Sequence, residues 1–178
     1  MLLERDTSQL LMIDFQERLI PAIENGAAVV ETAKRLLSVA RLLDVPVLVT
    51  EHMADKIGAT VAGLSVTADE LFDKSSFSAD RQMGFRDLLK RPQIILCGVE
   101  AHACVLQTAL DLHEAGFAVA VVEDAIGSRF ALDREVALRR MEHAGLARVT
   151  AEMVMFEWLG RGDHPAFPTV LKIMKERS

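Results

Sequence analysis

The stretch at residues 94–112, IILCGVEAHACVLQTALDL, joins a buried strand to the start of a helix. Residues 94–99 form an almost unbroken apolar run, which is typical of a strand covered on both faces. The helical pattern begins at about Cys104 and ends before Gly116. Cys104 therefore lies at a predicted helix N-terminus, where unpaired N–H groups and the helix dipole favour a thiolate. This position suits a catalytic nucleophile, although most single cysteines are simply small buried residues.

The segments on either side of this stretch alternate between strand and helix patterns. Strands are predicted at residues 9–15, 45–50, 71–74, 94–99, 117–122 and 147–150. Helices are predicted at residues 25–43, 78–90, 104–112, 133–144 and 151–159, with a last one beginning at His164 and Pro165. This alternation predicts an α/β fold with three layers, α-β-α, around a central and mostly parallel sheet. We expect a single domain over residues 1–178.

Composition argues against nucleic-acid binding, a paired-cysteine site and membrane insertion. The net charge of −6 and the pI near 5.4 argue against nucleic acid as the main partner. The two cysteines have the wrong spacing for a redox or zinc pair. No apolar run is long enough to span a bilayer, and charged residues at positions 4–6 interrupt any signal-peptide pattern, so we expect a cytoplasmic protein without membrane contact.

Three chemically useful side chains come directly at the ends of predicted strands: Asp14, Lys74 and Cys104. In an open parallel sheet, ligands bind at the C-terminal ends of the strands. Each residue also has an ordinary explanation, as a turn cap, a surface lysine or a packing residue. Their convergence on one edge of one sheet favours a catalytic site there. Because a strand edge is not the packed interior, we expect folding to survive their replacement.

The sequence resembles the isochorismatase-like cysteine hydrolases, in particular a short branch of mostly uncharacterised hydrolases. The similarity covers nearly the whole chain and is carried by LLMIDFQERLIPAI, VPVLVTEHMADKIGAT, DKSSFSA and GVEAHACVLQTALDLHEAGFAVAVVEDA. The most specific part is the strand followed by Gly-Val, four variable residues and Cys-Val. A motif in its expected structural context is a stronger indication than the motif alone. The resemblance implies a Rossmann-like topology.

The resemblance also implies catalytic roles for Asp14, Lys74 and Cys104. Asp14 would accept the thiol proton and return it to a leaving nitrogen, and Lys74 would hold Asp14 and stabilise the thiolate. The backbone N–H groups of Glu100 and Cys104 would form the oxyanion hole. The family places a cis peptide bond just before the first of these, here between Val99 and Glu100.

Other features separate this chain from parts of the family. Members that deaminate nicotinamide hold a metal with one Asp and two His, whereas the corresponding loop here offers only His52 and Asp55. We therefore expect neither a metal nor another cofactor. The branch that cleaves the isochorismate ether needs no cysteine nucleophile, so Cys104 argues against that chemistry. Pocket walls are predicted at residues next to the catalytic ones: Phe15, Gln16, Phe77 and His102.

The leading hypothesis is a metal-independent cysteine hydrolase that cleaves a C–N bond of a small amide, ureido or carbamoyl substrate through a thioester on Cys104. Two alternatives are a catalytically idle member that acts as a scaffold, and an ether hydrolase that uses Asp14. A flavodoxin-like cofactor binder is a further possibility, but the chain lacks a glycine-rich phosphate loop. We also expect a homo-oligomer, because residues 153–159 are more apolar than one covered helix face needs.

Overall fold

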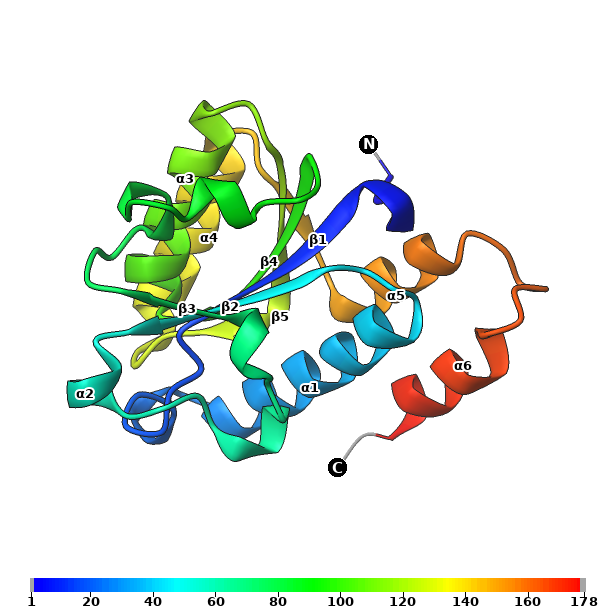
Figure 1. Cartoon of the computed structure of the whole chain (residues 1–178), viewed down its shortest axis with the longest axis horizontal. Helices are drawn as coiled ribbons and strands as arrows, with labels where there is room; N and C mark the ends of the chain where they lie inside the picture. Colours follow the sequence, from blue (N-terminus) through cyan, green and yellow to red (C-terminus); the bar gives the residue numbers. More distant parts are fainter. Residues whose placement is uncertain (1, 177–178) are drawn as a thin grey trace.

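The protein, described here by a computed structural model of residues 2–176, is built on one parallel sheet. Its strands lie in the order β3-β2-β1-β4-β5-β6, and each neighbouring pair is parallel (Figure 1). The strands are β1 Ser8–Ile13, β2 Val47–His52, β3 Leu71–Lys74, β4 Gln93–Val99, β5 Ala118–Gly127 and β6 Ala147–Val149. Every residue of β1 and β4 is buried, as the apolar runs predict for central strands.

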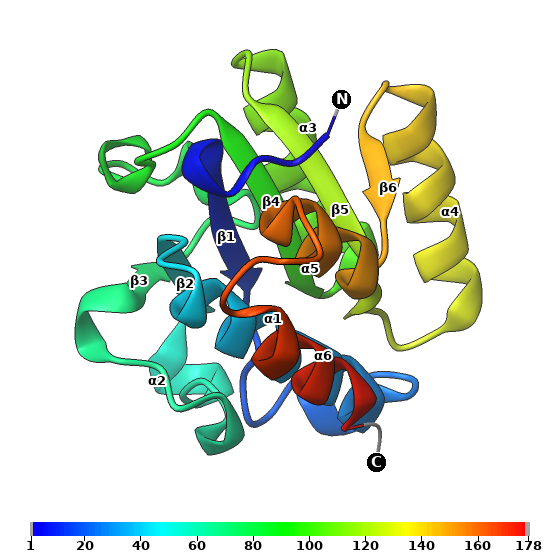
Figure 2. The same ribbon diagram turned by 90° about the vertical axis from the view of Figure 1, so that its right-hand side faces the viewer.

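Helices cover both faces of the sheet (Figure 2). On one face lie α1 Gly26–Leu42, α5 Ala151–Leu159 and α6 Phe167–Lys175, and on the other lie α3 Leu106–Glu114 and α4 Ala131–His143. Two hydrophobic clusters correspond to these two interfaces. The predicted three-layer α-β-α fold is therefore confirmed. Within residues 2–176, no helix has the length and apolar character that crossing a bilayer requires.

The strand order reverses between β1 and β4. The chain moves outward from β1 to β2 and β3, and then returns to place β4 on the other side of β1. The connections that leave β1 and β4 run to helices on opposite faces (Figure 1), and in open parallel sheets ligands bind at the C-terminal ends of strands at such a point. Asp14 follows β1 directly, and Cys104 lies just after β4. The fold thus puts two of the predicted catalytic residues at the ends of the two neighbouring strands where the order reverses.

Gly98 allows β1 and β4 to approach closely. It has a φ of +135°, and a Cβ atom built there would lie 2.1 Å from the carbonyl oxygen of Ile13. Any side chain would force the two strands apart, and the close approach therefore depends on glycine. Since Asp14 follows β1 and β4 leads to Cys104, Gly98 also sets how closely the two strands that position these residues approach.

One predicted helix is wrong. Residues 78–90 form only two short 3-10 turns, Ala79–Arg81 and Arg86–Leu88. Ser78 makes no capping hydrogen bond with its side chain, and the N–H of Ala79 donates instead to Thr108 Oγ1 at 2.9 Å. Gly84 then adopts a φ of +84°, which a right-handed helix does not allow.

Several other boundaries differ from the prediction. Cys104 lies in a π-helical turn, Ala101–Val105, that precedes α3. β5 extends to Gly127, well beyond the predicted residue 122. Residues 51–69, which lie outside the predicted strands and helices, include the end of β2, the short helix α2 Ala54–Ile57 and two 3-10 turns. The last helix has Pro168, and not Pro165, in its first turn.

Candidate active site

Asp14 directly follows the C-terminal end of β1 and is completely buried. Its carboxylate accepts two hydrogen bonds, from Thr50 Oγ1 to Oδ1 at 2.6 Å and from Lys74 Nζ to Oδ2 at 2.7 Å. Its backbone has a φ of +53°, in the left-handed region that aspartate tolerates better than most residues. The carboxylate is thus held on both oxygens and has one fixed orientation.

Lys74 ends β3 and is only 1% exposed, which rules out the alternative of a surface lysine. Its ammonium group pairs with Asp14 and also donates to the backbone carbonyls of Ser76 at 3.2 Å and Phe77 at 3.3 Å. Three acceptors match the three N–H bonds of an ammonium group. A buried charge needs this degree of compensation, so the site is built to keep the ion pair in place.

Cys104 lies beside this ion pair in the π-helical turn and is 7% exposed. The pKa of its thiol is raised to about 12, because burial and the charge of Asp14 together outweigh the opposing charge of Lys74. The helix N-terminus was expected to favour the thiolate, but the pKa is raised and not lowered. The resting sulfur is therefore protonated at neutral pH, and its attack requires a base. Asp14, which interacts with the thiol by charge and by hydrogen bonding, is placed to be that base.

The oxyanion donors expected from the sequence belong to the same turn. The peptide bond between Val99 and Glu100 is cis. The carbonyl oxygen of Glu100 accepts hydrogen bonds from the N–H groups of Ala103 at 3.1 Å and Val105 at 3.2 Å. These two bonds close the turn around Cys104, so Glu100 and Cys104 are parts of one compact backbone unit.

Two of the predicted pocket residues have structural roles instead. Phe15 is fully buried in the core against the α1 side of the sheet. Gln16 is also fully buried, and its amide donates to the carbonyls of His52 and Gly58 and accepts from the N–H of His52. A side chain with no exposed surface and no free hydrogen-bonding groups is poorly suited to bind a substrate. We therefore remove both from the predicted pocket.

The other two predicted pocket residues keep surface toward solvent. Phe77 is 56% exposed, and its ring stacks on His52 with centroids 5.5 Å apart. His102 is partly exposed, and its Nδ1 lies 3.0 Å from Ser128 Oγ. Phe77 joins the site through its carbonyl contact with Lys74, and His102 lies in the turn that carries Cys104. Both remain candidates for substrate contact.

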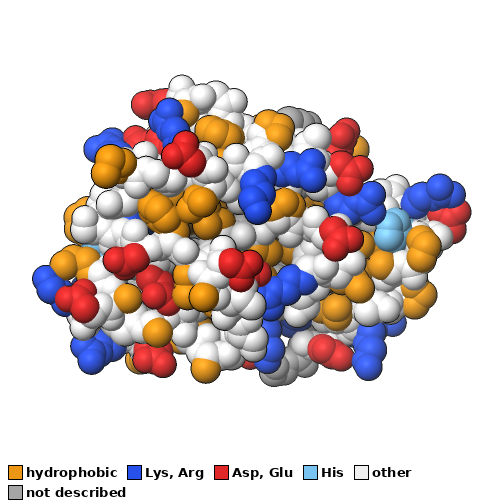
Figure 3. Space-filling view, in the orientation of Figure 1, with side chains coloured by type: hydrophobic (Ala, Val, Ile, Leu, Met, Phe, Trp, Pro, Cys, Tyr) orange, Lys and Arg blue, Asp and Glu red, His pale blue; other side chains and the backbone are white. Residues whose placement is uncertain are grey.

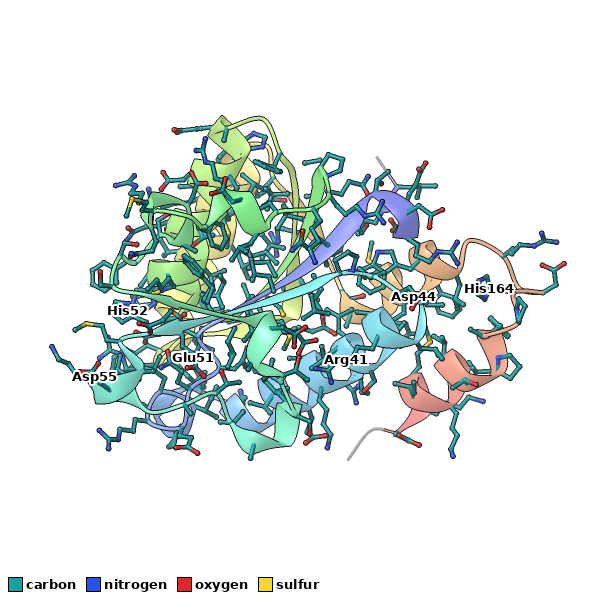
Figure 4. All side chains as sticks on the ribbon, in the orientation of Figure 1. Arg41, Asp44, Glu51, His52, Asp55 and His164 are labelled. Atoms are coloured by element: carbon teal, nitrogen blue, oxygen red, sulfur yellow. The ribbon has the colours of Figure 1, made fainter. Side chains whose placement is uncertain are left out.

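His52 and Asp55, which the sequence predicts to be too few to hold a metal, lie at the end of β2 and in α2. Figure 4 shows Glu51, His52 and Asp55 at this end of the molecule. Glu51 accepts hydrogen bonds from both the N–H and the hydroxyl of Thr60. Burial and the charge of Lys74 lower the pKa of His52. Among residues 2–176, no three His, Cys, Asp or Glu side chains are grouped so that they could hold a metal ion.

Sequence reasoning missed three residues that contact this site: Thr50, Ser128 and Arg129. Thr50 holds the second oxygen of Asp14, and it could have been found as the polar residue that ends the apolar run of β2. Ser128 contacts His102, and Arg129 forms an ion pair with Glu100. These two follow β5, beyond the predicted end of that strand, and no local pattern marks them. A separate cavity of about 390 Å³ lies between the start of α1 and the end of β5, and no catalytic candidate lines it.

Comparisons with known proteins agree with this architecture. The family model described as the isochorismatase domain matches residues 8–153. Isochorismatase domain-containing protein 2 from Rattus norvegicus is 39% identical over 174 residues, which are 96% of this chain and 82% of the relative.

Solved structures give the same result. The structure of MAR1 ribonuclease from Caenorhabditis elegans has a TM-score of 0.93 and 37% identity, and the match covers 98% of this chain and 92% of that one. The YcaC gene product from Escherichia coli, described as an octameric hydrolase of unknown specificity, has a TM-score of 0.90 and 23% identity. The match covers 97% of this chain and 90% of that one, and at this identity it supports the fold alone. The chain therefore belongs to the isochorismatase family of hydrolases.

Proposed function

We propose that the protein is a metal-independent cysteine hydrolase that cleaves a C–N bond of a small amide, ureido or carbamoyl compound. The observation that carries this proposal is the buried Lys74–Asp14 pair, with 2.7 Å between Nζ and Oδ2, beside the thiol of Cys104. A thiol with a raised pKa is of little use by itself, but with a buried carboxylate next to it the thiol can be deprotonated during attack.

In the first half of the reaction, Asp14 accepts the Sγ proton while the sulfur forms a bond to the carbonyl carbon of the substrate. The carbonyl oxygen gains negative charge, which the N–H groups of Glu100 and Cys104 would stabilise. The C–N bond then breaks, and the leaving nitrogen takes the proton from Asp14. The product of this half is a thioester on Cys104.

In the second half, a water molecule attacks the thioester carbon and Asp14 accepts a proton from that water. The C–S bond breaks, the acid product leaves, and the proton returns to the sulfur. Lys74 keeps its ion pair with Asp14 throughout, so the carboxylate stays oriented toward the sulfur in both halves. The mechanism uses no redox step and no metal.

A ribonuclease is the second candidate, because the 37% identical relative from C. elegans carries that name. RNA binding at moderate salt depends largely on positive charge along the path of the phosphates. The net charge here is −6, and Lys and Arg side chains are interspersed with Asp and Glu over the face drawn in Figure 3. The charge distribution therefore favours a small uncharged substrate.

The proposal is tested with a panel of small primary amides, ureido compounds and carbamoyl compounds, with ammonia release as the readout. A single-stranded RNA oligonucleotide serves as the competing substrate, and every assay is repeated after dialysis against a chelator. We expect turnover of at least one panel member, no RNA cleavage, and the same rate after dialysis. Turnover of RNA alone, or activity that is lost with chelator and restored by zinc, would contradict the proposal.

We further propose that the protein forms a homo-oligomer and acts in the cytoplasm. Most of the apolar residues at 153–159 turn out to pack into the core, but Met153 and Phe156 on α5 are 46% and 43% exposed. Phe130 and Leu132, where α4 begins, are each 66% exposed. Exposed apolar groups of this kind often mark subunit interfaces. Light scattering at micromolar concentration should report a mass above that of one chain, and a monomer would refute the proposal.

A further inference from the structure

The connection between β5 and α4 reaches the nucleophile turn because β5 bulges beside β4. Leu96 pairs with Val121, but Gly98 pairs with Ile126, so β5 uses several more residues than β4 over the same length. Arg134 of α4 donates to the backbone carbonyls of Glu123 and Ile126 and thereby holds the bulge. Bulges near active sites commonly re-aim the side chains that follow them.

After the bulge, Val99 pairs with Gly127, and the next two residues of the connection contact the turn. Ser128 Oγ lies 3.0 Å from His102 Nδ1, and Arg129 Nε donates to Glu100 Oε1 at 2.8 Å. Ser128 is only 2% exposed, and its carbonyl accepts a hydrogen bond from the N–H of Glu24 at 3.0 Å. The connection is therefore anchored to the rest of the protein.

The two contacted residues are structurally important parts of the turn. Glu100 closes the turn through its carbonyl oxygen and carries one expected oxyanion N–H, while its side chain is held by Arg129. His102 lies within the turn, between Glu100 and Cys104. A shift of either residue would move the N–H groups relative to the sulfur, and the strength of oxyanion stabilisation depends steeply on this geometry.

We propose that Ser128 and Arg129 are positioning residues of this active site: they hold His102 and Glu100, and through them the orientation of the oxyanion donors. The proposal rests on the proposed cysteine chemistry and extends it to a part of the chain outside the family's nucleophile motif. The two residues act only through others, so they should affect oxyanion stabilisation without changing the intrinsic reactivity of the sulfur.

A small aldehyde separates these two properties. With propionaldehyde, the Cys104 sulfur adds to the carbonyl carbon, the C=O π bond breaks, and the oxygen takes up the thiol proton by way of Asp14. The resulting thiohemiacetal has the shape of the tetrahedral intermediate, and its hydroxyl oxygen occupies the oxyanion position, where it accepts hydrogen bonds from the same donors. Alkylation by iodoacetamide uses the same sulfur but places no negative charge on a carbonyl oxygen, so it reports the thiol alone.

The experiment measures how strongly propionaldehyde protects Cys104 of the full chain from iodoacetamide at pH 9, with peptide mass mapping as the readout. Ser128→Ala and Arg129→Gln should each raise the dissociation constant of the aldehyde about tenfold. This is the lower end of the effects seen when a residue that only holds another site residue is removed. Arg129→Lys should recover part of the affinity because it keeps the charge. Alkylation without aldehyde should change less than about twofold, since neither residue acts on the sulfur.

Arg139→Gln is the matched control, because Arg139 is a similarly exposed arginine that forms a 2.9 Å ion pair with Glu135 within α4 and has no ion pair with the turn. This variant should bind the aldehyde like the unaltered protein. Unchanged aldehyde affinity in both Ser128→Ala and Arg129→Gln would overturn this inference and leave the cysteine mechanism standing. Absence of any aldehyde protection in the unaltered protein would overturn the cysteine mechanism and this inference with it.

Discussion

Cys97 and Cys104 belong to one stretch of chain but lie in different surroundings. Cys97 is in the middle of β4 with no exposed surface, and burial together with the charge of Asp124 raises the pKa of its thiol. Cys104 is also largely buried, and its pKa is also raised, to about 12. The two sulfurs are therefore similar in burial and in the direction of their pKa shifts, and they differ mainly in the side chains around them. What distinguishes Cys104 is a carboxylate that can take its proton and an ammonium group that holds that carboxylate.

The largest effect should come from removing each sulfur in turn. Cys104→Ala should lower kcat by about three orders of magnitude or more, as expected when a nucleophile is lost. Cys97→Ala removes a core atom outside the site and should leave kcat within about threefold while lowering stability by roughly 1 kcal/mol. Steady-state kinetics and chemical denaturation of both variants measure these quantities. Comparable losses of kcat in the two variants would remove the distinction between the cysteines.

The second test concerns the pair that distinguishes Cys104. Lys74→Met leaves the Asp14 carboxylate buried without its partner and should lower the free energy of unfolding by about 3–5 kcal/mol, along with a loss of activity. The double variant Asp14→Asn with Lys74→Met removes both charges and should regain much of the stability but none of the activity. Urea denaturation compares the three proteins. If the single variant were as stable as the unaltered protein, the pair would not be the buried ion pair described here.

The third test concerns the spacing between β1, which Asp14 follows, and β4, which contains Cys97 and leads to Cys104. Gly98→Ala places a Cβ against the backbone of Ile13 and should destabilise the protein by about 1–3 kcal/mol, with reduced activity. Gly63→Ala is the control, because no atom lies within 4 Å of a Cβ built at that position. Thermal denaturation of both should show a clear loss only for Gly98→Ala. Equal stability of the two variants would show that close strand approach is not required.

The last test leaves both sulfurs in place and concerns the pH dependence of Cys104 alkylation. Because its pKa is near 12, the thiolate fraction should grow about tenfold per pH unit across the whole range from pH 6 to pH 10. The iodoacetamide rate at Cys104 should therefore rise without a plateau, and Cys97 should stay unlabelled in the folded protein. Peptide mapping at several pH values follows both. A plateau near pH 7 would show a lowered pKa and would contradict the resting thiol described here.

The sequence predicted the layers of the fold and the residues at the strand ends because both follow from local patterns. Asp14 and Lys74 each end a strand segment, and the sheet brings their ends together. The expectation that folding would survive their replacement assumed exposed side chains at a strand edge. Both side chains prove to be fully buried, which removes the reason for that expectation. Burial depends on segments distant in the sequence, which a strand-end pattern does not report.

Other parts of the site depend on tertiary structure in the same way. The direction of the Cys104 pKa shift is set by burial and the charge of Asp14, and neither can be read from the position of Cys104 in the sequence. Ser128 and Arg129 reach the turn only through the bulge in β5, and no periodicity of residues 117–129 signals that register shift. The predicted helix at 78–90 failed at Gly84, whose backbone conformation is incompatible with it.

The central claim is that Cys104 forms a thioester during turnover. The most direct measurement is intact-mass spectrometry after rapid acid quench with a turned-over member of the amide panel, followed by peptide mapping. We expect a mass increase equal to the acyl group, located on the peptide of Cys104 and absent in Cys104→Ala. A protein that turns over substrate with no adduct on Cys104, while Cys104→Ala keeps most of its activity, would contradict the account.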